Sequence, residues 1–169
     1  MKILDASPVI CVLKEIEEPK IFDICETLGH ELYVTNEVYE ELKKNEHTFK
    51  KFQDYGKIAV LPSDKLPFDI TKAIESYKKR YPWIHDGEAS VICVGHYLKD
   101  NNIPFYCIID EDARNISKAE NLPTTGTIGL IIWERDKEQL GTDEIDKIKK
   151  ELRDSPFRIS EELLKKLDS

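Results

Sequence analysis

The stretch Phe105-Tyr106-Cys107-Ile108-Ile109-Asp110 (FYCIID) places a carboxylate directly after five apolar or aromatic residues. These residues do not alternate with polar ones, which is typical of a central strand that is covered on both faces of a parallel sheet. The chain opens on a similar pattern, because Lys2–Leu4 runs into Asp5. The sequence therefore predicts two buried strands that each end on an aspartate.

Short apolar runs alternate with helical patterns along the rest of the chain. The predicted strands are Lys2–Leu4, Leu32–Thr35, Ile58–Leu61, Phe105–Asp110 and a short piece near Pro123–Thr125. The predicted helices are Pro8–Glu15, Pro19–Leu28, Asn36–Lys44, Ile70–Arg80, Gly87–Lys99, Asp112–Glu120, Ile128–Lys137, Glu144–Arg153 and Ser160–Leu167. This alternation favours an α/β fold with a parallel sheet flanked by helices.

The composition indicates one globular domain. A chain of 169 residues can bury a substantial core, and no linker rich in Pro, Gly or Ser divides it. We therefore expect a single domain over residues 1–169, in which residues 141–169 form a C-terminal helical extension. No apolar run approaches the roughly 20 residues that cross a bilayer. The first residues also lack the apolar region of a signal peptide, so we expect a cytoplasmic protein without a membrane partner.

The formal net charge of −8 argues against a generally basic nucleic-acid-binding protein. It remains compatible with an enzyme that concentrates carboxylates around metal ions. The four cysteines share no CxxC spacing and sit among apolar neighbours. We interpret them as buried thiols rather than as zinc ligands or disulfides: Cys11, Cys25, Cys93 and Cys107.

Two aspartates follow predicted strands, and this position favours a shared site. In open parallel sheets, ligands bind in the crevice beyond the carboxyl ends of the strands. Asp5 and Asp110 both stand at such ends. If their two strands are neighbours, the carboxylates point into the same crevice. Asp112 follows closely and is interpreted as the cap of the next helix or as a further ligand.

The predicted helix over residues 36–44 presents another acid to the same region. Its buried side is the i,i+4 pair Val38 and Leu42. Glu40 lies about 160° or more around the helix from both of these residues and should face water. Glu41 lies at the edge of the buried stripe, which makes it the better candidate for the site. Thr35 or Asn36 supplies the N-cap of this helix.

Glu88 precedes the apolar stripe of the predicted helix Gly87–Lys99 and lies on the same face in the first turn. A carboxylate there is favoured by the helix dipole, so the residue either stabilises the helix start or joins the site. Asp86 is explained without any chemistry as the N-cap of the same helix. The residues alone leave both interpretations of Glu88 open.

Four motifs resemble, in order and spacing, those of PIN-domain proteins: Asp5-Ala6-Ser7-Pro8-Val9-Ile10, Thr35-x-x-Val38-x-x-Glu41-Leu42, Gly87-Glu88-Ala89-Ser90-x-Ile92 and Asp110-x-x-Ala113-Arg114. The segments Thr125–Leu130 and Phe157–Ser160 resemble a PIN-like subfamily that is common in archaea and some bacteria and carries a Gly-Thr-x-Gly motif. The resemblance covers essentially the whole chain. It implies a three-layer α/β/α sandwich with a central, mostly parallel sheet and the activity of a metal-dependent ribonuclease.

The resemblance implies a catalytic and metal-binding acidic quartet at Asp5, Glu41, Glu88 and Asp110. It also implies that Ser7 supports the first aspartate. One position departs from the family pattern, because Ile108 stands where a hydroxyl residue often precedes the fourth acid. Since Glu111 and Asp112 follow directly, the assignment of the fourth acid stays open by one or two positions, and Asp112 is an additional candidate ligand.

Four carboxylates in one crevice repel each other unless cations join them. Oxygen ligands suit Mg²⁺ or Mn²⁺, so we expect one of these ions as the cofactor of RNA phosphodiester hydrolysis. The metal would activate the attacking water and stabilise charge on the phosphate and the leaving oxygen. Asp5 and Asp110 would be the principal ligands, and Glu41 and Glu88 would complete the shell directly or through water.

The stretch Ser76–Trp83 interleaves cations with aromatic rings. One interpretation is an RNA-binding segment whose rings stack on unpaired bases and whose cations hold phosphates: Lys78, Lys79 and Arg80. The other interpretation is a solvated helix end followed by a loop whose Trp83 side chain packs against the protein. Arg114 either contacts an RNA phosphate or pairs with a nearby acid.

Two other functions compete with this interpretation. A phosphohydrolase with an aspartyl nucleophile usually shows Asp-x-Asp after its first strand, and Asp5-Ala6-Ser7 lacks the second aspartate. A non-catalytic RNA- or protein-binding regulatory protein would keep the fold without turnover. Many PIN-domain proteins are VapC-like toxins of toxin–antitoxin pairs. If this chain is one, a small antitoxin should cover the crevice, and the resemblance also implies a homodimer.

Overall fold

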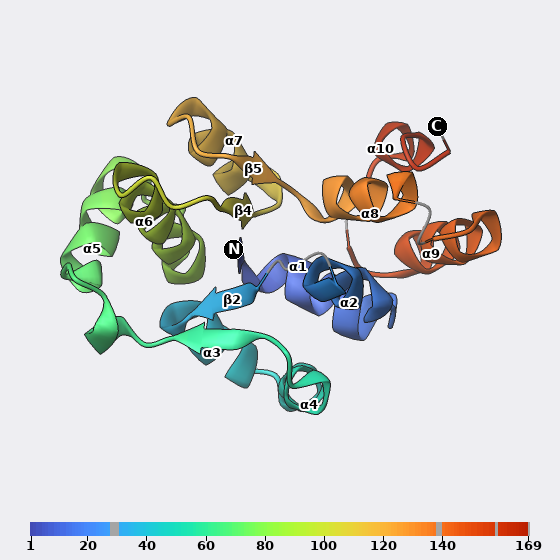
Figure 1. The fold of residues 1–169 in the computed structure, drawn as a ribbon, viewed down its shortest axis with the longest axis horizontal. Coiled ribbons are helices and arrows are strands. Elements are labelled where there is room, and N and C mark those ends of the chain that lie inside the picture. The colour runs from blue at the N-terminus through green and yellow to red at the C-terminus, as the bar shows by residue number, and fades with distance from the viewer. Residues whose placement is uncertain (28–30, 138–139, 158, 169) are drawn as a thin grey trace.

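A sheet of five parallel strands forms the centre of the computed structural model, which describes residues 1–27, 31–137, 140–157 and 159–168. The strands are β1 (Lys2–Leu4), β2 (Leu32–Thr35), β3 (Ala59–Leu61), β4 (Tyr106–Ile108) and β5 (Thr124–Thr125). Their order across the sheet is β3-β2-β1-β4-β5 (Figure 1). Leu4 of the middle strand β1 pairs with Val34 on one side and with Ile108 on the other. The predicted parallel sheet is confirmed.

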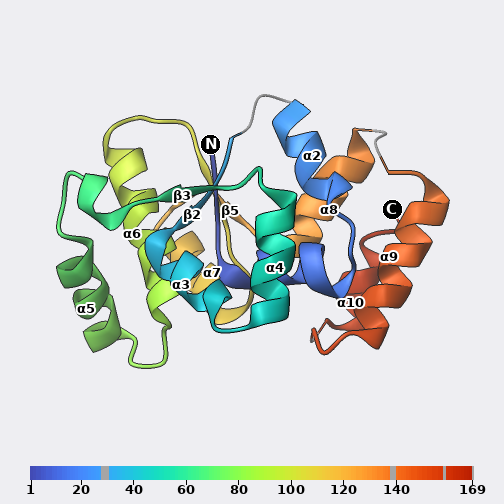
Figure 2. The same cartoon turned by 90° about the horizontal axis from the view of Figure 1, so that it is seen from below.

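Helices cover both faces of this sheet. They are α1 (Ala6–Ile10), α2 (Lys20–Thr27), α3 (Asn36–Lys43), α4 (Glu46–Tyr55), α5 (Ile70–Arg80), α6 (Asp86–Asp100), α7 (Glu111–Ala119), α8 (Thr127–Asp136), α9 (Thr142–Asp154) and α10 (Glu161–Lys165). Figures 1 and 2 show α5 and α6 on one side of the strands and α1, α2, α8 and α9 on the other. The molecule is therefore the predicted three-layer α/β/α sandwich.

The central strands are buried on both faces, which explains why their sequences do not alternate. Leu4 of β1 and Cys107 and Ile108 of β4 are completely inaccessible to solvent. Buried hydrophobic residues from all three layers form a single cluster, to which Ile148 of α9 and Leu164 of α10 also contribute. The end of the chain thus packs into the same core as the strands.

A relay of hydrogen bonds joins α3 to α6 beneath the carboxyl ends of the strands. The Thr35 hydroxyl accepts the Val38 N–H at 3.2 Å and so caps α3. The Ser90 hydroxyl donates to the Gly87 carbonyl, and its oxygen lies 2.6 Å from the Thr35 hydroxyl. Because the single Ser90 proton is already used, Thr35 must be the donor in the bond between them. Both residues are buried, so the relay is shielded from water.

The helix α4 was not predicted from the sequence. Most of its residues are polar, and its few aromatic residues, Phe49, Phe52 and Tyr55, recur at helical spacing but were not recognised as the buried side of a helix. Its ends are nevertheless well defined, because the Asn45 side chain accepts a backbone N–H of the first turn and Gly56 ends the helix with φ +67°. Phe52 packs against Tyr39 of α3, with ring centroids 6.0 Å apart.

Three predicted helix starts are corrected by the structure. The first helix begins at Ala6 rather than Pro8, and it continues as a π-helical segment over Cys11–Glu15. His85, not Asp86, occupies the N-cap position of α6. Asp112 was expected to cap the helix after β4, but α7 already begins at Glu111 and Asp110 occupies its N-cap position.

The cysteines agree with the prediction of buried thiols as far as they are described. Cys11, Cys93 and Cys107 are free and buried. Cys25 lies outside the side chains that the structure describes. Among the described helices, none is both long and apolar enough to cross a membrane.

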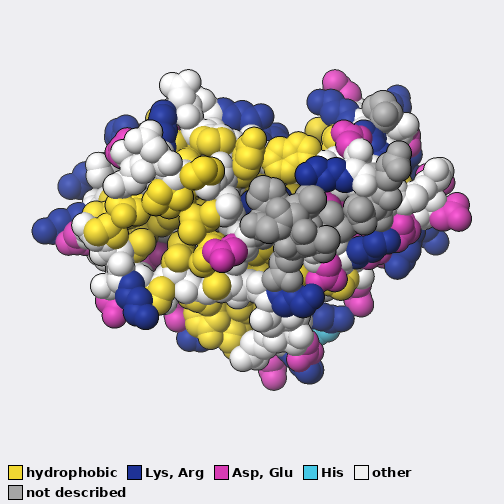
Figure 3. Space-filling view, in the orientation of Figure 1, with side chains coloured by type: hydrophobic (Ala, Val, Ile, Leu, Met, Phe, Trp, Pro, Cys, Tyr) yellow, Lys and Arg dark blue, Asp and Glu magenta, His cyan; other side chains and the backbone are white. Residues whose placement is uncertain are grey.

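The amino ends of the strands carry a largely hydrophobic surface. Figure 3 faces these ends and shows hydrophobic side chains gathered over β4 and α6. Tyr106, the first residue of β4, is partly exposed and packs edge to face against Trp133 of α8, with ring centroids 5.0 Å apart. The Lys2 ammonium lies 5.5 Å from the centre of the same indole. The acidic residues that follow the strands lie at the opposite ends.

We expect Thr35→Val to lower the free energy of unfolding by about 1–3 kcal/mol, because it removes a helix cap and a buried hydrogen bond while keeping the side-chain volume. Chemical denaturation measures this difference. Thr71→Val makes the same change at an exposed position of α5 and should stay within about 0.5 kcal/mol of the parent. Equal stability of the two variants would show that the relay contributes nothing.

Candidate functional site

The two central strands deliver Asp5 and Asp110 to the same edge of the sheet. Asp5 follows β1 directly, and its backbone N–H donates to the Ile108 carbonyl of β4 at 3.0 Å. Asp110 follows β4 after one further residue, Ile109. Figure 2 shows α1, α3 and α7 gathered at this end of the strands. The sheet topology therefore supplies the neighbouring strands on which the shared crevice depends.

Helices α3 and α6 bring two glutamates to the same place. A methyl group on Gly87, in the first turn of α6, would lie 2.8 Å from Glu41 Oε2 and 3.6 Å from Asp5 Oδ1. Glu88 is the next residue of α6, and its carboxylate accepts the backbone N–H of His85 at 3.0 Å. Because Gly87 has no side chain, α6 can approach the carboxylates of Glu41 and Asp5 closely.

Asp5 is the most confined of these acids. Its side chain is only 3% exposed, and Oδ1 has no hydrogen-bond partner among the described residues. Burial raises the pKa of Asp5 well above its usual range, and the charges of Glu88, Glu41 and Asp110 raise it further. The Ala6 backbone N–H opposes this shift. All four predicted acids therefore interact electrostatically at Asp5.

Asp110 is held in place by a residue from a later element. The Thr127 backbone N–H donates to Asp110 Oδ1 at 2.9 Å, and the Thr127 hydroxyl donates to Oδ2 at 2.5 Å. Burial raises the pKa of Asp110 even though these two bonds and the charge of Arg114 lower it. Asp110 is thus satisfied by the protein, whereas Asp5 is not.

Two glycines beside Thr127 explain the spacing of the Gly-Thr-x-Gly segment. A methyl group on Gly126 would overlap Asp110 Oδ1 and lie 2.9 Å from Arg114 Nη1. A methyl group on Gly129 would overlap the Thr125 hydroxyl. The sequence motif was recognised, but no contact of Thr127 with Asp110 was predicted. One pattern in the sequence could have indicated this contact. A short strand is followed by a glycine and then by a helix, and the first N–H groups of that helix would lie beside the end of the neighbouring strand.

Glu111 adds a fifth negative charge to this region. Its φ of +56° is unusual for a residue with a side chain, and it stands directly after Asp110. Its charge raises the pKa of both Asp110 and Glu88, although burial is the larger cause in each case. Asp112 is exposed in the first turn of α7. Its role as a further ligand stays a prediction.

Ser7, which was predicted to support Asp5, is partly buried in the first turn of α1. Its supporting role stays a prediction. Arg114 of α7 approaches Asp110 closely enough for its charge to lower the pKa of that carboxyl, so the guanidinium lies beside the acidic site. The interpretation of Arg114 as a partner of a nearby acid fits this placement.

The chemistry of these residues suits a hard divalent cation. Carboxylate oxygens are the ligands that Mg²⁺ and Mn²⁺ prefer, and the unpartnered Asp5 Oδ1 is a buried acceptor without a donor. Among the described residues, however, no group of three or more His, Cys, Asp or Glu side chains stands arranged around a metal position. Thr127 holds Asp110 and the His85 amide holds Glu88.

A pocket of about 500 Å³ opens beside Glu41 and Gly87, whereas Asp5 and Asp110 do not line it. Its walls come from α3, from the end of α5, from the loop before α6 and from the start of α6. Acidic and basic side chains both line it, together with His85: Glu37, Glu40, Glu41, Lys44, Lys78 and Asp86. The pocket therefore extends from the acidic site toward the stretch Ser76–Trp83.

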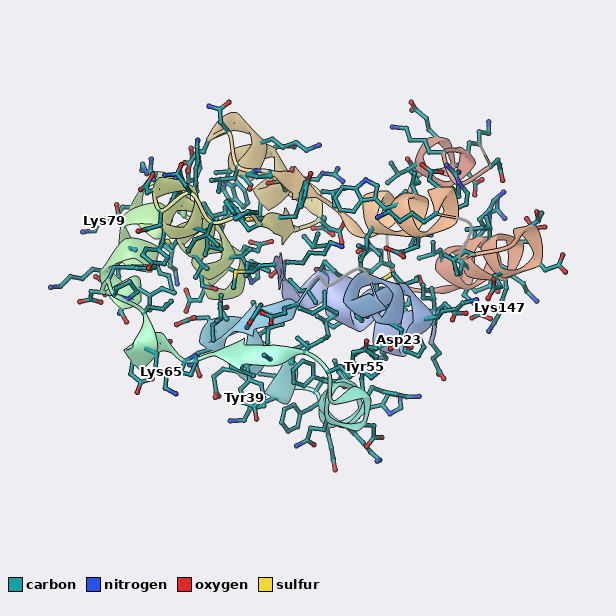
Figure 4. The ribbon with its side chains drawn as sticks, viewed as in Figure 1. Asp23, Tyr39, Tyr55, Lys65, Lys79 and Lys147 are labelled. Carbon is teal, nitrogen blue, oxygen red and sulfur yellow. The ribbon has the colours of Figure 1, made fainter. Side chains whose placement is uncertain are left out.

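The three cations predicted to bind RNA point in different directions. Lys78 lines the pocket and forms a 2.6 Å ion pair with Asp86. Lys79 extends from α5 into solvent at the outer edge of the molecule (Figure 4). The Arg80 guanidinium lies over the Tyr77 ring, 4.5 Å from its centre, and 3.9 Å from Glu120. Of these three cations, the structure thus places only Lys78 at the pocket beside the acids.

We expect Gly87→Ala to remain folded, because the helix propensity of alanine, better by about 1 kcal/mol, offsets the close 3.2 Å contact that its methyl group would make with the buried Val38 side chain. It should lose most of the stabilisation that Mn²⁺ confers, because the new methyl group displaces the Glu41 carboxylate. The measurement is the rise in Tm on replacing EDTA with Mn²⁺. Gly141→Ala is the control, since its methyl group would lie 3.8 Å from the nearest side-chain atom. An equal rise in Tm with Mn²⁺ in the two variants would contradict the placement of Glu41 beside Gly87 in the metal site.

We expect Asp5→Asn to raise Tm by a few degrees in EDTA at pH 8. Since the pKa of Asp5 is raised in the folded state, the folded protein binds this proton more tightly than the unfolded chain does. The free energy of unfolding therefore falls as pH rises from about 4, the unfolded carboxyl pKa, through the folded-state value. The Tm difference should shrink toward pH 4. Glu40→Gln, on the exposed face of α3, is the control.

The comparison with protein families agrees with the fold and the order of these elements. A family model described as DUF3368, PIN domain, matches residues 1–168. No curated protein and no solved structure matches the chain. The match spans nearly the whole sequence and includes every element that carries the acidic residues. The chain therefore belongs to the PIN-domain family.

Proposed function

We propose that this protein is a metal-dependent ribonuclease that hydrolyses RNA phosphodiester bonds at the acidic site. The observation that carries the proposal is the buried, unpartnered carboxylate of Asp5 beside three further acids. Such an arrangement is unfavourable for a fold alone, because each like charge adds to the cost of burying the others. A divalent cation would turn this repulsion into attraction. Family membership supports the same activity, since nucleases are typical of PIN domains.

In this proposal Asp5 and Asp110 would be the principal ligands of Mg²⁺ or Mn²⁺, and Glu41 and Glu88 would complete the shell directly or through water. When bound, the ion would supply water activation and charge stabilisation at the phosphate. Thr127 orients Asp110 through its two hydrogen bonds. The His85 N–H orients Glu88. Such second contacts usually tune metal affinity and activity by about 10–100-fold.

RNA reaches an acidic protein through local cations. Lys78 lies at the pocket and Arg114 beside Asp110, so among the four cations predicted to bind RNA these two are the ones that we place nearest to it. Lys79 would act only at the periphery of a longer RNA, and Arg80 would act mainly by supporting the aromatic rings. We further propose a cytoplasmic toxin of a toxin–antitoxin pair, whose antitoxin covers the crevice, and a homodimer as its assembly.

One observation favours a second function. Among the described residues, no group of three or more acidic side chains stands arranged around a metal position. A non-catalytic RNA- or protein-binding regulatory protein that keeps the PIN fold would show this arrangement. Such a protein would bind RNA or a partner equally well in EDTA and in Mn²⁺, and it would not cleave RNA.

We expect the purified chain to cleave RNA in Mn²⁺ or Mg²⁺ and not in EDTA. Asp110→Asn should reduce this cleavage by at least about 100-fold, because the variant removes one charged ligand while keeping the side-chain shape. Gel analysis of structured and unstructured RNAs measures this. Asp146→Asn makes the same change at an exposed position of α9, away from the pocket, and is the matched control that should retain full activity.

The outcomes separate the two functions. Cleavage that is equal in the parent and in Asp110→Asn would indicate a contaminant or a misassigned acid. RNA binding without cleavage in either metal, by a protein whose Tm does not respond to Mn²⁺, would support the regulatory function instead.

A further inference from the structure

We propose that Trp83 is a stacking platform for an unpaired nucleobase of the RNA, next to the phosphodiester bond that is cleaved. The inference rests on the proposed function and adds a binding site to it. Trp83 is 49% exposed, which makes it one of the few large hydrophobic side chains that the described part of the molecule leaves open to solvent. It lines the same pocket as Glu41 and Gly87, so a base stacked on it would lie beside the acidic site.

The backbone holds Trp83 in a defined position. Residues 81–84 form a turn that is closed by a 3.0 Å hydrogen bond from the Ile84 N–H to the Tyr81 carbonyl. Pro82 stands at the second position of this turn, where its restricted φ favours the turn conformation. Ile84 is buried in the core and anchors one end of the turn. Trp83 is therefore exposed although its backbone is tied down on both sides.

A row of aromatic rings supports the other end of the turn. Trp83 packs edge to face against Tyr81, with ring centroids 6.2 Å apart, and Tyr81 stacks on Tyr77 at 6.4 Å. The Arg80 guanidinium lies 5.7 Å from the centre of the Tyr81 ring and 4.5 Å from that of Tyr77. Glu120 in turn accepts a hydrogen bond from the Tyr77 hydroxyl. A rigid aromatic side chain loses little conformational entropy when a base stacks on it.

The charges around the pocket favour a base over a phosphate in its interior. Acidic side chains on its walls repel phosphate oxygens but can accept hydrogen bonds from the amino groups of an uncharged base. Lys44 and Lys78 lie at the pocket and can attract the flanking phosphates. The ion pair of Lys78 with Asp86 is exposed on both partners and can exchange for a phosphate at little cost. The occupant that fits is thus a single-stranded nucleotide.

The two tryptophans of the chain allow a direct test. Trp133→Phe leaves Trp83 as the only indole, and its fluorescence is titrated with a short unstructured RNA in EDTA, where metal-dependent cleavage does not occur. We expect saturable quenching, and much weaker quenching by the same sequence in a duplex, because paired bases are not free to stack. Trp133→Tyr serves the same purpose if the phenylalanine variant does not fold.

Matched variants decide whether the stack contributes to binding. Trp83→Ala should weaken RNA binding roughly 5- to 100-fold, and Trp83→Phe should restore most of the affinity, because phenylalanine still offers a ring face. Trp83→Phe also leaves Trp133 as the only indole, at the far ends of the strands, and its fluorescence should not respond to RNA. Lys44→Ala should weaken binding and reduce its salt dependence.

The result is independent of catalysis. No quenching of Trp83 by single-stranded RNA, or equal affinity of Trp83→Ala and the parent, would overturn the inference even if the protein cleaves RNA. Quenching together with the loss of affinity in Trp83→Ala would support it even if no cleavage is found, and in that case the proposed nuclease function would be the part that fails.

Discussion

The burial of Asp5 is the constraint on which the rest of the site depends. The residue ends the middle strand of the sheet, so its carboxylate must lose its hydration while three other acids stand nearby. A hydrophobic core that extends through all three layers maintains the fold in spite of this cost. Arrangements of this kind oppose stability and are characteristic of functional sites. A bound cation would offset the electrostatic cost of burying Asp5 among these acids.

Close approach of the backbone makes the crowding of acids geometrically feasible. At Gly87 and Gly126 a methyl group would meet a carboxylate oxygen of Glu41 or Asp110. The two neighbourhoods differ in their polar partners, because Thr127 satisfies Asp110 whereas Asp5 Oδ1 has no partner among the described residues. The site thus combines one carboxylate whose position the protein sets with one that is left available to a ligand.

The acidic character of the whole chain does not conflict with binding of RNA, because the local distribution of charge decides what approaches the site. Consecutive residues of a helix project about 100° apart, so neighbouring cations cannot all serve the same surface. Lys78 therefore faces the pocket, Lys79 faces solvent and Arg80 covers aromatic rings. A pocket with few accessible cations and an exposed ring suits bases better than phosphates.

Periodicity along the chain was sufficient for the features that depend on neighbours in sequence. The runs that end at Asp5 and Asp110 were predicted as buried strands, and α3 buries Val38 and Leu42 while Glu40 remains exposed. These features follow from which residues share a strand or a helix face, and this is determined within a few residues. The parallel sheet was predictable for the same reason, since strands and helices alternate along the chain.

Tertiary structure decided what depends on segments far apart in the chain. The bonds of Thr127 to Asp110 join residues 17 positions apart, and the relay from Thr35 to Ser90 joins residues 55 positions apart. The polar helix α4 also escaped prediction, because few of its residues are apolar; its caps and contacts such as that of Phe52 with Tyr39 define it in the structure. The sequence by itself determined which acids end the strands. The packing of distant elements decided which of these acids accept hydrogen bonds and where each cation points. Local sequence patterns contain no information about the distances between such elements.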